Sequence, residues 1–449
     1  MDANELLKRY AAGERDFRGA YLVRADLMFA ELSLADLYDA DLSCADLFEA
    51  KLSGIKLSGA NLENAHLSRA DLSNGKLFGA RLSYADLSRA DLFRADLFRA
   101  DLTDADLRSA NLTRADLSGA NLTRANLNEA TLSQANLSDS NLSFASLNNA
   151  KLNGAKLNGA NLSEARLFDS DLTGAKLEKA DLRNAELFAA KLIEANLVEA
   201  DLRNAKFSEA NLSKAKLDGT NLSGSNLSRT NLSEASLTEA NLTEANLSEA
   251  TLRKANLSGA KLCDANLSRA NLSEANLVAA DLSSPKKEPI AERSLSLKNK
   301  KSVMLGRDPS VSLQIYSPFV SRRHASIDIE DNGQYVIRDH NSTNGVFVND
   351  QQIEESMVLP DGARIRIGPF LLILNGDELE LQDEQNRQPT SLSEADLSQA
   401  DLRNANLAGA NFYRANLKGA NLYGANLTGS NLSHANLSGA TMPDGSIHP

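Results

Sequence analysis

A leucine recurs at every fifth position over most of the chain, and this period constrains the fold more than any other feature. From Phe17 to Leu282, all 54 positions in this phase are Leu except Phe17 and Phe207. The residue two places before each Leu is nearly always Ala, and the residue directly before it is usually Asp or Asn. The chain therefore repeats one short structural unit, and its fold must accommodate a period of five.

A period of five suits neither a straight helix nor a flat strand. In an α-helix of 3.6 residues per turn the leucines would drift around the axis and form no stripe. In a flat strand successive leucines would alternate between the two faces, because five is odd. Both conflicts disappear if the chain turns a corner in every repeat, so that Ala and Leu point inward together. The pattern predicts a solenoid with a ladder of leucines as its core and with each coil paired to the next.

The motif Ala-(Asp/Asn)-Leu-x-x resembles that of the pentapeptide-repeat family. The resemblance implies an all-β fold over residues 17–284, a long right-handed quadrilateral β-helix with four repeats per coil. Residues 1–16 precede the pattern, and the stretch from Glu5 to Tyr10 reads as a short helix. We expect this helical segment to cap the first coil, because an open solenoid end exposes core residues and unpaired backbone.

Proline marks where the long repeat ends. All nine Pro residues lie after residue 284, and residues 285–293 read as a linker. Residues 294–378 then carry short β-like runs separated by Gly, Asn and Asp: 302–305, 326–329, 334–337, 345–348, 364–367 and 370–374. This spacing predicts an antiparallel β-sandwich as a second domain.

Three short motifs fall in order within this second domain. They are Gly306-Arg307, then Ser321-Arg322-Arg323-His324, then Asn341-Ser342-Thr343-Asn344-Gly345. Together they resemble the signature of the forkhead-associated (FHA) domain, which implies recognition of phosphothreonine peptides by loops at one end of the sandwich. The expected partner is therefore a phosphothreonine-containing protein, the substrate of a Ser/Thr kinase.

The residue types in these motifs suit a phosphate dianion, which needs charge-assisted donors on fixed loops. Arg307 offers a planar fork of N–H donors, and Ser321 offers its hydroxyl and neighbouring backbone. By resemblance, Arg322 is a second phosphate contact, Thr343 helps to read the phosphothreonine and Asn344 holds the peptide backbone. Resemblance also assigns architectural roles to three further residues: Gly306, His324 and Gly345. The alternative is that Arg307 and Arg322 are ordinary surface arginines.

The period of five returns near the end of the chain. Residues 379–390 read as an acidic polar linker, residues 391–442 repeat the motif, and residues 443–449 form a tail. The second segment amounts to under three coils, which is marginal for an independent solenoid. Two arrangements are open: the segment stacks on the long rod with the FHA domain looped out, or it pairs with another chain in a homodimer.

Composition excludes several classes of function. The formal net charge is −12, which argues against direct nucleic-acid binding, since that requires a concentrated basic face. No apolar run is long enough to span a membrane, and the first residues lack the features of a signal peptide, so we expect a cytoplasmic location. No catalytic constellation, metal-ligand spacing or cofactor motif is present. The sequence predicts a non-enzymatic protein without metal or cofactor.

Three functions remain open. The first is a phosphopeptide-binding adaptor, with the rod as a rigid spacer or interaction surface. The second is an inhibitor that mimics DNA toward a DNA-binding enzyme such as a type II topoisomerase. Residues 1–284 carry 40 acidic and 32 basic side chains, a net charge of −8, but the two signs are interleaved, whereas a DNA mimic needs a dense negative stripe. The third is a purely structural rod.

Overall fold

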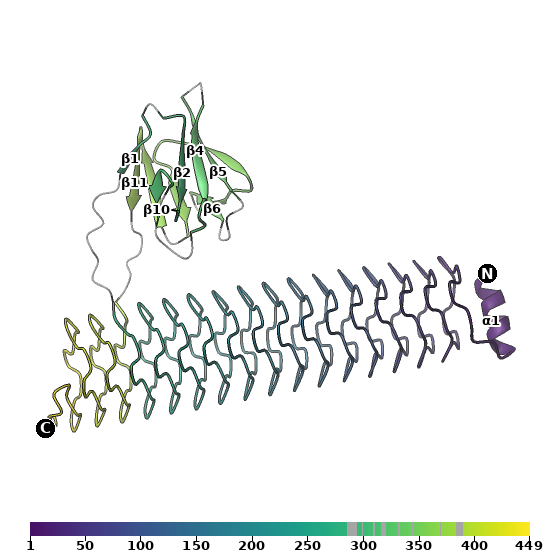
Figure 1. Cartoon of the computed structure of the whole chain (residues 1–449), viewed down its shortest axis with the longest axis horizontal. Coiled ribbons are helices and arrows are strands. Elements are labelled where there is room, and N and C mark those ends of the chain that lie inside the picture. Colours follow the sequence, from purple (N-terminus) through teal and green to yellow (C-terminus); the bar gives the residue numbers. More distant parts are fainter. Residues whose placement is uncertain are drawn as a thin grey trace. The chain divides into compact units, whose positions relative to one another are not determined.

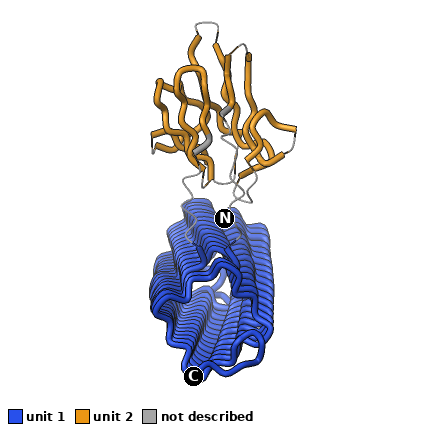
Figure 2. The backbone as a smooth tube through the Cα atoms, turned by 90° about the vertical axis from the view of Figure 1, so that its left-hand side faces the viewer, with its two compact units in different colours: residues 1–285, 389–449 blue, residues 286–388 orange. Residues whose placement is uncertain are grey.

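A computed structural model of the chain contains two compact units, residues 1–285 with 389–449 and residues 286–388 (Figures 1 and 2). Each unit has its own hydrophobic core and is described separately. The described residues are 1–284, 294–298, 300–308, 310–315, 320–330, 333–340, 342, 345–349, 351–368, 370–382 and 389–449.

The first unit is a rod whose coils contain 20 residues. Parallel β-bridges join each residue before a Leu to the residue 20 positions later, from Asp16 paired with Asp36 to Lys261 paired with Asp281. Four repeats therefore complete one coil, as the resemblance implied. Residues 16–284 and 391–442 make about 16 coils, roughly 75 Å of rod at about 4.8 Å per coil.

A repeat of the rod with Asp or Asn before its Leu satisfies all five of its backbone N–H groups. In the repeat centred on Leu162, three N–H groups donate to carbonyls of the adjacent coils and one closes a turn within the repeat. The remaining N–H, that of Ser163, donates to the side-chain Oδ1 of Asn161 (3.0 Å). The other acceptors are Ser140 O for Asn161 (2.9 Å), Asp181 O for Leu162 (2.7 Å), Arg183 O for Glu164 (2.9 Å) and Leu162 O for Ala165 (3.0 Å). Where Asp or Asn precedes the Leu, its side-chain oxygen is thus the acceptor for the one N–H that has no backbone partner.

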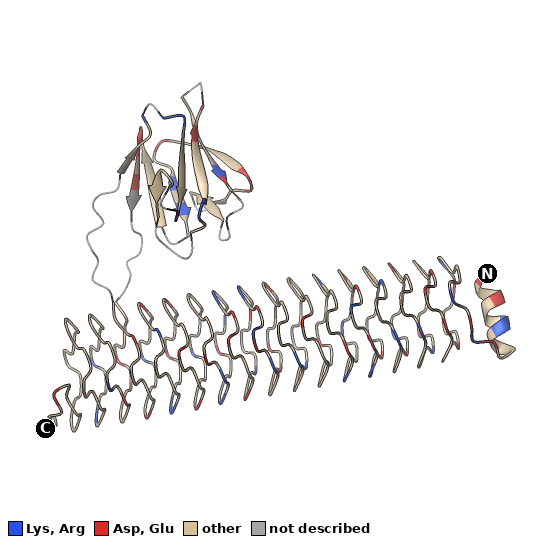
Figure 3. Cartoon of the chain, in the orientation of Figure 1, with Lys and Arg blue, Asp and Glu red and all other residues tan. Residues whose placement is uncertain are grey.

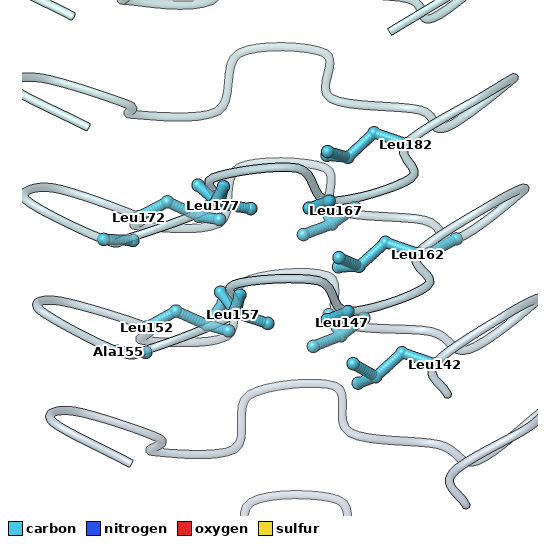
Figure 4. Packing of buried hydrophobic residues seen from close by; sticks show 14 of the residues in the cluster. Leu142, Leu147, Leu152, Ala155, Leu157, Leu162, Leu167, Leu172, Leu177 and Leu182 are labelled. Carbon is cyan, nitrogen blue, oxygen red and sulfur yellow. The ribbon is translucent and has the colours of Figure 1, made fainter. Parts of the chain in front are cut away.

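The core of the rod is a stack of inward-pointing leucines. Leu142, Leu147, Leu152 and Leu157 each come from a different side of one coil (Figure 4). All four are fully buried, as are the alanines two positions before most leucines. The last residue of each repeat adopts φ near +60°, for example +59° at Arg89, and this left-handed conformation turns the corner to the next side. Leucine fills the centre, and the small alanine side chain fits beside the corner.

Helix α1 (Ala3–Ala11) lies at the N-terminal end of the rod (Figure 1). The Asp2 carboxylate accepts the N–H of Glu5 (2.8 Å) and caps the first turn of the helix. Leu6 is fully buried within the leucine core, and the Tyr10 hydroxyl donates to the Ser33 carbonyl (2.8 Å). The helix therefore covers the first coil with its apolar face.

The second repeat segment continues the long rod. Ser391 bridges Asn266, and the next three bridges join residues 271, 276 and 281 to residues 396, 401 and 406. Leu392 to Leu422 belong to the same core cluster as the leucines of the long segment. Of the two arrangements left open by the sequence, the structure has the stacked one. The last coil is followed by an antiparallel bridge between Thr441 and Ile447.

The second unit is a sandwich of two sheets around one core cluster. One sheet has the order β1-β11-β10-β9-β6-β7, and the other has the order β3-β2-β4-β5-β8. All neighbours are antiparallel except β2 and β3. The strands are β1 (Ser294–Ser296), β2 (Ser302–Gly306), β3 (Leu313–Gln314), β4 (Ala325–Ile329), β5 (Tyr335–Asp339), β6 (Val346–Val348), β7 (Gln351–Gln352), β8 (Ser356–Leu359), β9 (Arg364–Ile367), β10 (Phe370–Asn375) and β11 (Glu378–Gln382).

Strand β11 begins at the last predicted residue of the sandwich and continues into the predicted linker 379–390. It pairs with both β1 and β10, and Leu379 is fully buried in the sandwich core. The alternation Glu-Leu-Glu-Leu over residues 378–381 has the period of a strand. The linker predicted for residues 379–390 is therefore wrong over residues 379–382: the acidic residues favour a linker, but the buried leucine between them places this segment in the sheet.

Candidate functional site

The loop that follows β2 is hydrogen-bonded to the segment before β4. The Arg307 N–H donates to the Ser321 carbonyl (3.1 Å), and the Asp308 N–H donates to the Arg322 carbonyl (3.1 Å). A Cβ atom on Gly306 would lie 2.2 Å from the Arg322 carbonyl oxygen. Only glycine permits this approach, so Gly306 is what allows Arg307, Ser321 and Arg322 to lie next to one another.

His324 links this pair of loops to a third one. It is fully buried; its Nδ1 accepts the Ser321 N–H (3.0 Å), and its Nε2 lies 3.1 Å from the Gly345 carbonyl. Because Nδ1 is an acceptor, the proton must be on Nε2, which donates to Gly345. Burial lowers the pKa of His324, with the Gly345 bond opposing the effect. A neutral imidazole therefore holds the loops before β4 and β6 together.

The third loop precedes β6. Gly345 has φ +69°, a left-handed conformation suited to glycine, and the Ser342 N–H is accepted by the Asp339 carboxylate (2.9 Å). Thr343 and Asn344, which resemblance assigns to peptide contacts, lie outside the described residues. The structure thus brings together Gly306, Arg307, Ser321, Arg322, His324 and Gly345, six of the eight residues selected from the sequence.

The exposed surface of these loops is basic. Arg307, Arg322 and Arg323 are all exposed, whereas Ser321 is half-buried. One carboxylate, that of Asp308, stands among them. Hydrogen bonds from the Ser310 hydroxyl and N–H lower the pKa of Asp308, and the positive charges of Arg322 and Arg323 lower it further. The cluster therefore offers guanidinium donors to an anion on a backbone that its own hydrogen bonds fix.

Sequence reasoning missed Asp308 and Ser310. The Asp308 carboxylate accepts both the N–H (2.9 Å) and the hydroxyl (2.7 Å) of Ser310, which fixes the turn directly after Arg307. The local signal was an Asp followed two residues later by Ser, the pattern of an Asx-turn. His340 was also missed: its Nε2 lies 3.0 Å from the Ser326 hydroxyl oxygen, beside the His324 backbone.

The described parts of the chain contain no group of three or more His, Cys, Asp or Glu side chains placed to hold a metal ion. They also include no helix with the length and apolar character needed to cross a bilayer.

Comparison with family models yields two matches. The model described as pentapeptide repeats (8 copies) matches residues 15–43, 45–284 and 390–443, more than two thirds of the chain. The model described as FHA domain matches residues 303–368. These two regions correspond to the rod and to the sandwich that carries the basic loops.

Similar individual proteins cover one unit or the other. The glycogen accumulation regulator GarA of Mycolicibacterium smegmatis is 37% identical over 68 residues, which are 15% of this chain and 42% of GarA. The chain thus spans about two fifths of the length of the curated relatives that it matches.

Two solved structures extend the comparison. HetL, a pentapeptide repeat protein involved in heterocyst differentiation regulation in the cyanobacterium Nostoc, is 27% identical, with a TM-score of 0.27 over 71% of this chain and 91% of HetL. EmbR of Mycobacterium tuberculosis, solved in complex with a low-affinity phosphopeptide, is 32% identical over 18% of this chain and 20% of EmbR, with a TM-score of 0.15. Because the TM-scores are low, the assignment of the two units to families depends on the two family models.

Proposed function

The chain belongs to the pentapeptide-repeat family and carries an FHA domain, and from this premise we propose that it is a non-enzymatic adaptor that binds phosphothreonine peptides. The FHA domain recruits a phosphorylated partner protein, and the rod acts as a rigid spacer or a further interaction surface. The expected setting is the cytoplasm.

One observation carries the proposal. Arg307, Ser321 and Arg322 converge from two loops that are hydrogen-bonded to each other and to the buried His324. A phosphate dianion is bound best by charge-assisted donors whose positions are fixed before binding, since less conformational entropy is then lost. The proposed roles are a guanidinium fork from Arg307, hydroxyl and backbone donors from Ser321, and a second cation from Arg322.

The surface of the rod favours an adaptor over a DNA mimic. The corner residues between positions 69 and 124 include one acid, Asp104, and six arginines: Arg69, Arg89, Arg94, Arg99, Arg114 and Arg124. Figure 3 shows the two signs of charge interleaved along the rod. A rod that imitates the DNA backbone needs one negative charge per few ångströms along a continuous stripe.

The test is a titration of the full chain with a degenerate phosphothreonine peptide library and with its unphosphorylated twin. We expect phosphorylation-dependent binding that Arg307→Ala weakens by about tenfold or more, because a charge-assisted bidentate contact is lost. Arg338→Ala is the matched control: Arg338 lies on β5 and pairs with Asp328 (2.8 Å), and this change should leave affinity unaltered. Equal binding of the two libraries, or equal loss in both variants, would refute the proposal.

A further inference from the structure

One side of the rod carries a groove that the proposed function does not use. This groove, here called the arginine groove, has a volume of about 560 Å³ and runs from Phe48 to Asn128 and Glu129. Its floor contains Ser68 and Ser88. Its lining residues recur 20 positions apart, so they lie on the same side of successive coils.

The groove exists because small residues stand between large ones at the same position of the repeat. Phe48 precedes Ser68 and Ser88 in this column, and Arg108 and Asn128 follow them. The Ser88 hydroxyl donates to the Ser68 hydroxyl (3.1 Å), which ties the two floor residues together. The two serines therefore leave a depression with polar atoms on its floor.

An aromatic cluster borders one end of the groove. The Phe48 ring meets Phe29 edge to face with centroids 5.6 Å apart, and it stacks on His66 at 5.5 Å. Phe29 is 58% exposed although it occupies a left-handed corner with φ +58°. Exposed aromatic residues of this kind mark contact surfaces for other proteins.

The middle of the groove holds a cation without a counter-charge. Arg69 pairs with Glu49 (3.0 Å), and Arg108 pairs with Asp106 in its own repeat (2.6 Å). Arg89 lies between them at an exposed corner, and its guanidinium has no hydrogen bond or ion pair with any described residue. At the far end, the carboxylate of Glu129 is engaged by the Ser109 hydroxyl (3.0 Å). A ligand with a single carboxylate near its middle would complement this charge pattern.

We propose that the arginine groove binds an extended acidic peptide segment of a partner protein, with an apolar side chain against Phe29 and Phe48 and a carboxylate on Arg89. Phe48 and Asn128 are four coils apart, about 19 Å at the spacing of neighbouring strands, which matches about six residues of extended peptide. The floor hydroxyls of Ser68 and Ser88 supply hydrogen bonds to the peptide between the two anchors. This surface is separate from the phosphopeptide loops and does not depend on them.

The probe is a displayed library of random unphosphorylated heptapeptides, selected on the full chain. Every protein sample carries Arg307→Ala, so that the loops of the FHA domain do not contribute. We expect the selected sequences to place an apolar residue a few positions from an Asp or Glu. A synthetic peptide of the most enriched sequence is then titrated by fluorescence polarisation.

Three variants make the test specific. Arg89→Glu should weaken the peptide by about fivefold or more, because an attraction becomes a repulsion. Ser88→Phe should abolish binding by filling the floor, and phenylalanine already occupies the same repeat position at Phe93 and Phe98. Arg94→Glu, at the next corner of the same coil, should leave the affinity unchanged within about twofold.

Circular dichroism verifies that each variant stays folded. The proposal is overturned if no peptide is enriched over the bare support, if the enriched peptides lack acidic residues, or if Arg89→Glu and Arg94→Glu bind the peptide equally.

Discussion

Ile55 and Gly75 form a compensating pair in the core of the rod, and their coupling is measurable. Both stand where nearly every other repeat has alanine, on the same side of adjacent coils. Ile55 is 1% exposed, and a Cβ atom on Gly75 would lie 3.6 Å from its Cγ2. The same Cβ would also lie 3.1 Å from Leu77 Cδ1 and 2.8 Å from the Leu72 carbonyl oxygen. The large side chain in one coil thus packs directly against the position that a side chain at residue 75 would take in the next.

The two single substitutions should each destabilise the rod. Ile55→Ala removes three buried carbons beside a residue that has no side chain, so we expect a loss of about 3–4 kcal/mol in the free energy of unfolding. Gly75→Ala adds a methyl group against Ile55 and Leu77 and should cost about 1–2 kcal/mol, after the gain from a less flexible unfolded chain.

The double variant should recover most of this loss, because it has the Ala–Ala pair found in other coils. Relative to the native pair it loses two buried carbons, about 1.6 kcal/mol. The expected coupling free energy, the sum of the two single losses less the loss in the double variant, is therefore about 2.5–4.5 kcal/mol, at or above the upper limit usual for residues in contact. The contact with the Leu72 carbonyl is the same whether residue 55 is Ile or Ala, so it does not contribute to the coupling free energy of this double-mutant cycle.

The assay is urea unfolding of the full chain, combined with hydrogen exchange of peptides from residues 50–80, since a solenoid need not unfold in one step. A transplanted pair serves as the control: Ala135 and Ala155 lie in the same column of the rod and are fully buried. Ala135→Ile should destabilise the rod, and adding Ala155→Gly should restore part of the loss. Single effects that add within about 0.5 kcal/mol would refute the reasoning.

Three further predictions concern single side chains. Thr390→Ala should destabilise the rod by about 1–3 kcal/mol in urea unfolding, because the Thr390 hydroxyl accepts the Asp264 N–H (2.9 Å) and this bond is lost. Ser225→Ala is the control: it removes a buried hydroxyl without a hydrogen-bond partner and should be neutral or stabilising. Burial lowers the pKa of His324, so below about pH 6.5 the unfolded state binds the extra proton first and the stability of the sandwich falls. The protection factors of the β4 amides, which are exchange rates corrected for the intrinsic rate at each pH, should therefore be smaller at pH 5.5 than at pH 7.5. Gly306→Ala should abolish phosphopeptide binding, since its Cβ would lie 2.2 Å from a backbone carbonyl oxygen; unchanged affinity would contradict the packing described here.

The rod could be predicted from the sequence because a period of five residues by itself excludes a straight helix and a flat strand. A residue such as Leu162 has one environment, repeated in every coil, so local pattern and tertiary contact agree. The role of Asn161 could not be read in this way, because its hydrogen bond to the Ser163 N–H becomes visible only when the backbone partners of the repeat are counted.

The sandwich was harder to predict at its edges. The sequence predicts the longer core strands β2, β4, β5, β9 and β10 to within two residues at each end. Strands β1, β3, β7 and β8 have only two to four residues, too few for a periodic signal. At the site, the ordered motifs located Arg307 and Ser321, but Asp308 contributes through an Asx-turn and electrostatics that no motif records.

The repeats that follow the FHA domain show what the five-residue register of the sequence cannot predict. An inserted domain can have any length, so the residue numbering does not determine whether the last repeats stack on the rod. The decision depends on whether the coil can close around the insertion, and here Thr390 closes it. In the preceding coil the N–H of Glu244 donates to the carbonyl of Cys263, whereas one coil later the N–H of Asp264 donates to the Thr390 hydroxyl. The Thr390 N–H is in turn accepted by the Ser284 hydroxyl (2.6 Å). These side chains replace the backbone hydrogen bonds that are lost where the chain leaves the rod to form the FHA domain, so the rod continues. The insertion then costs only the entropy of closing a loop, which rises slowly with the length of the loop.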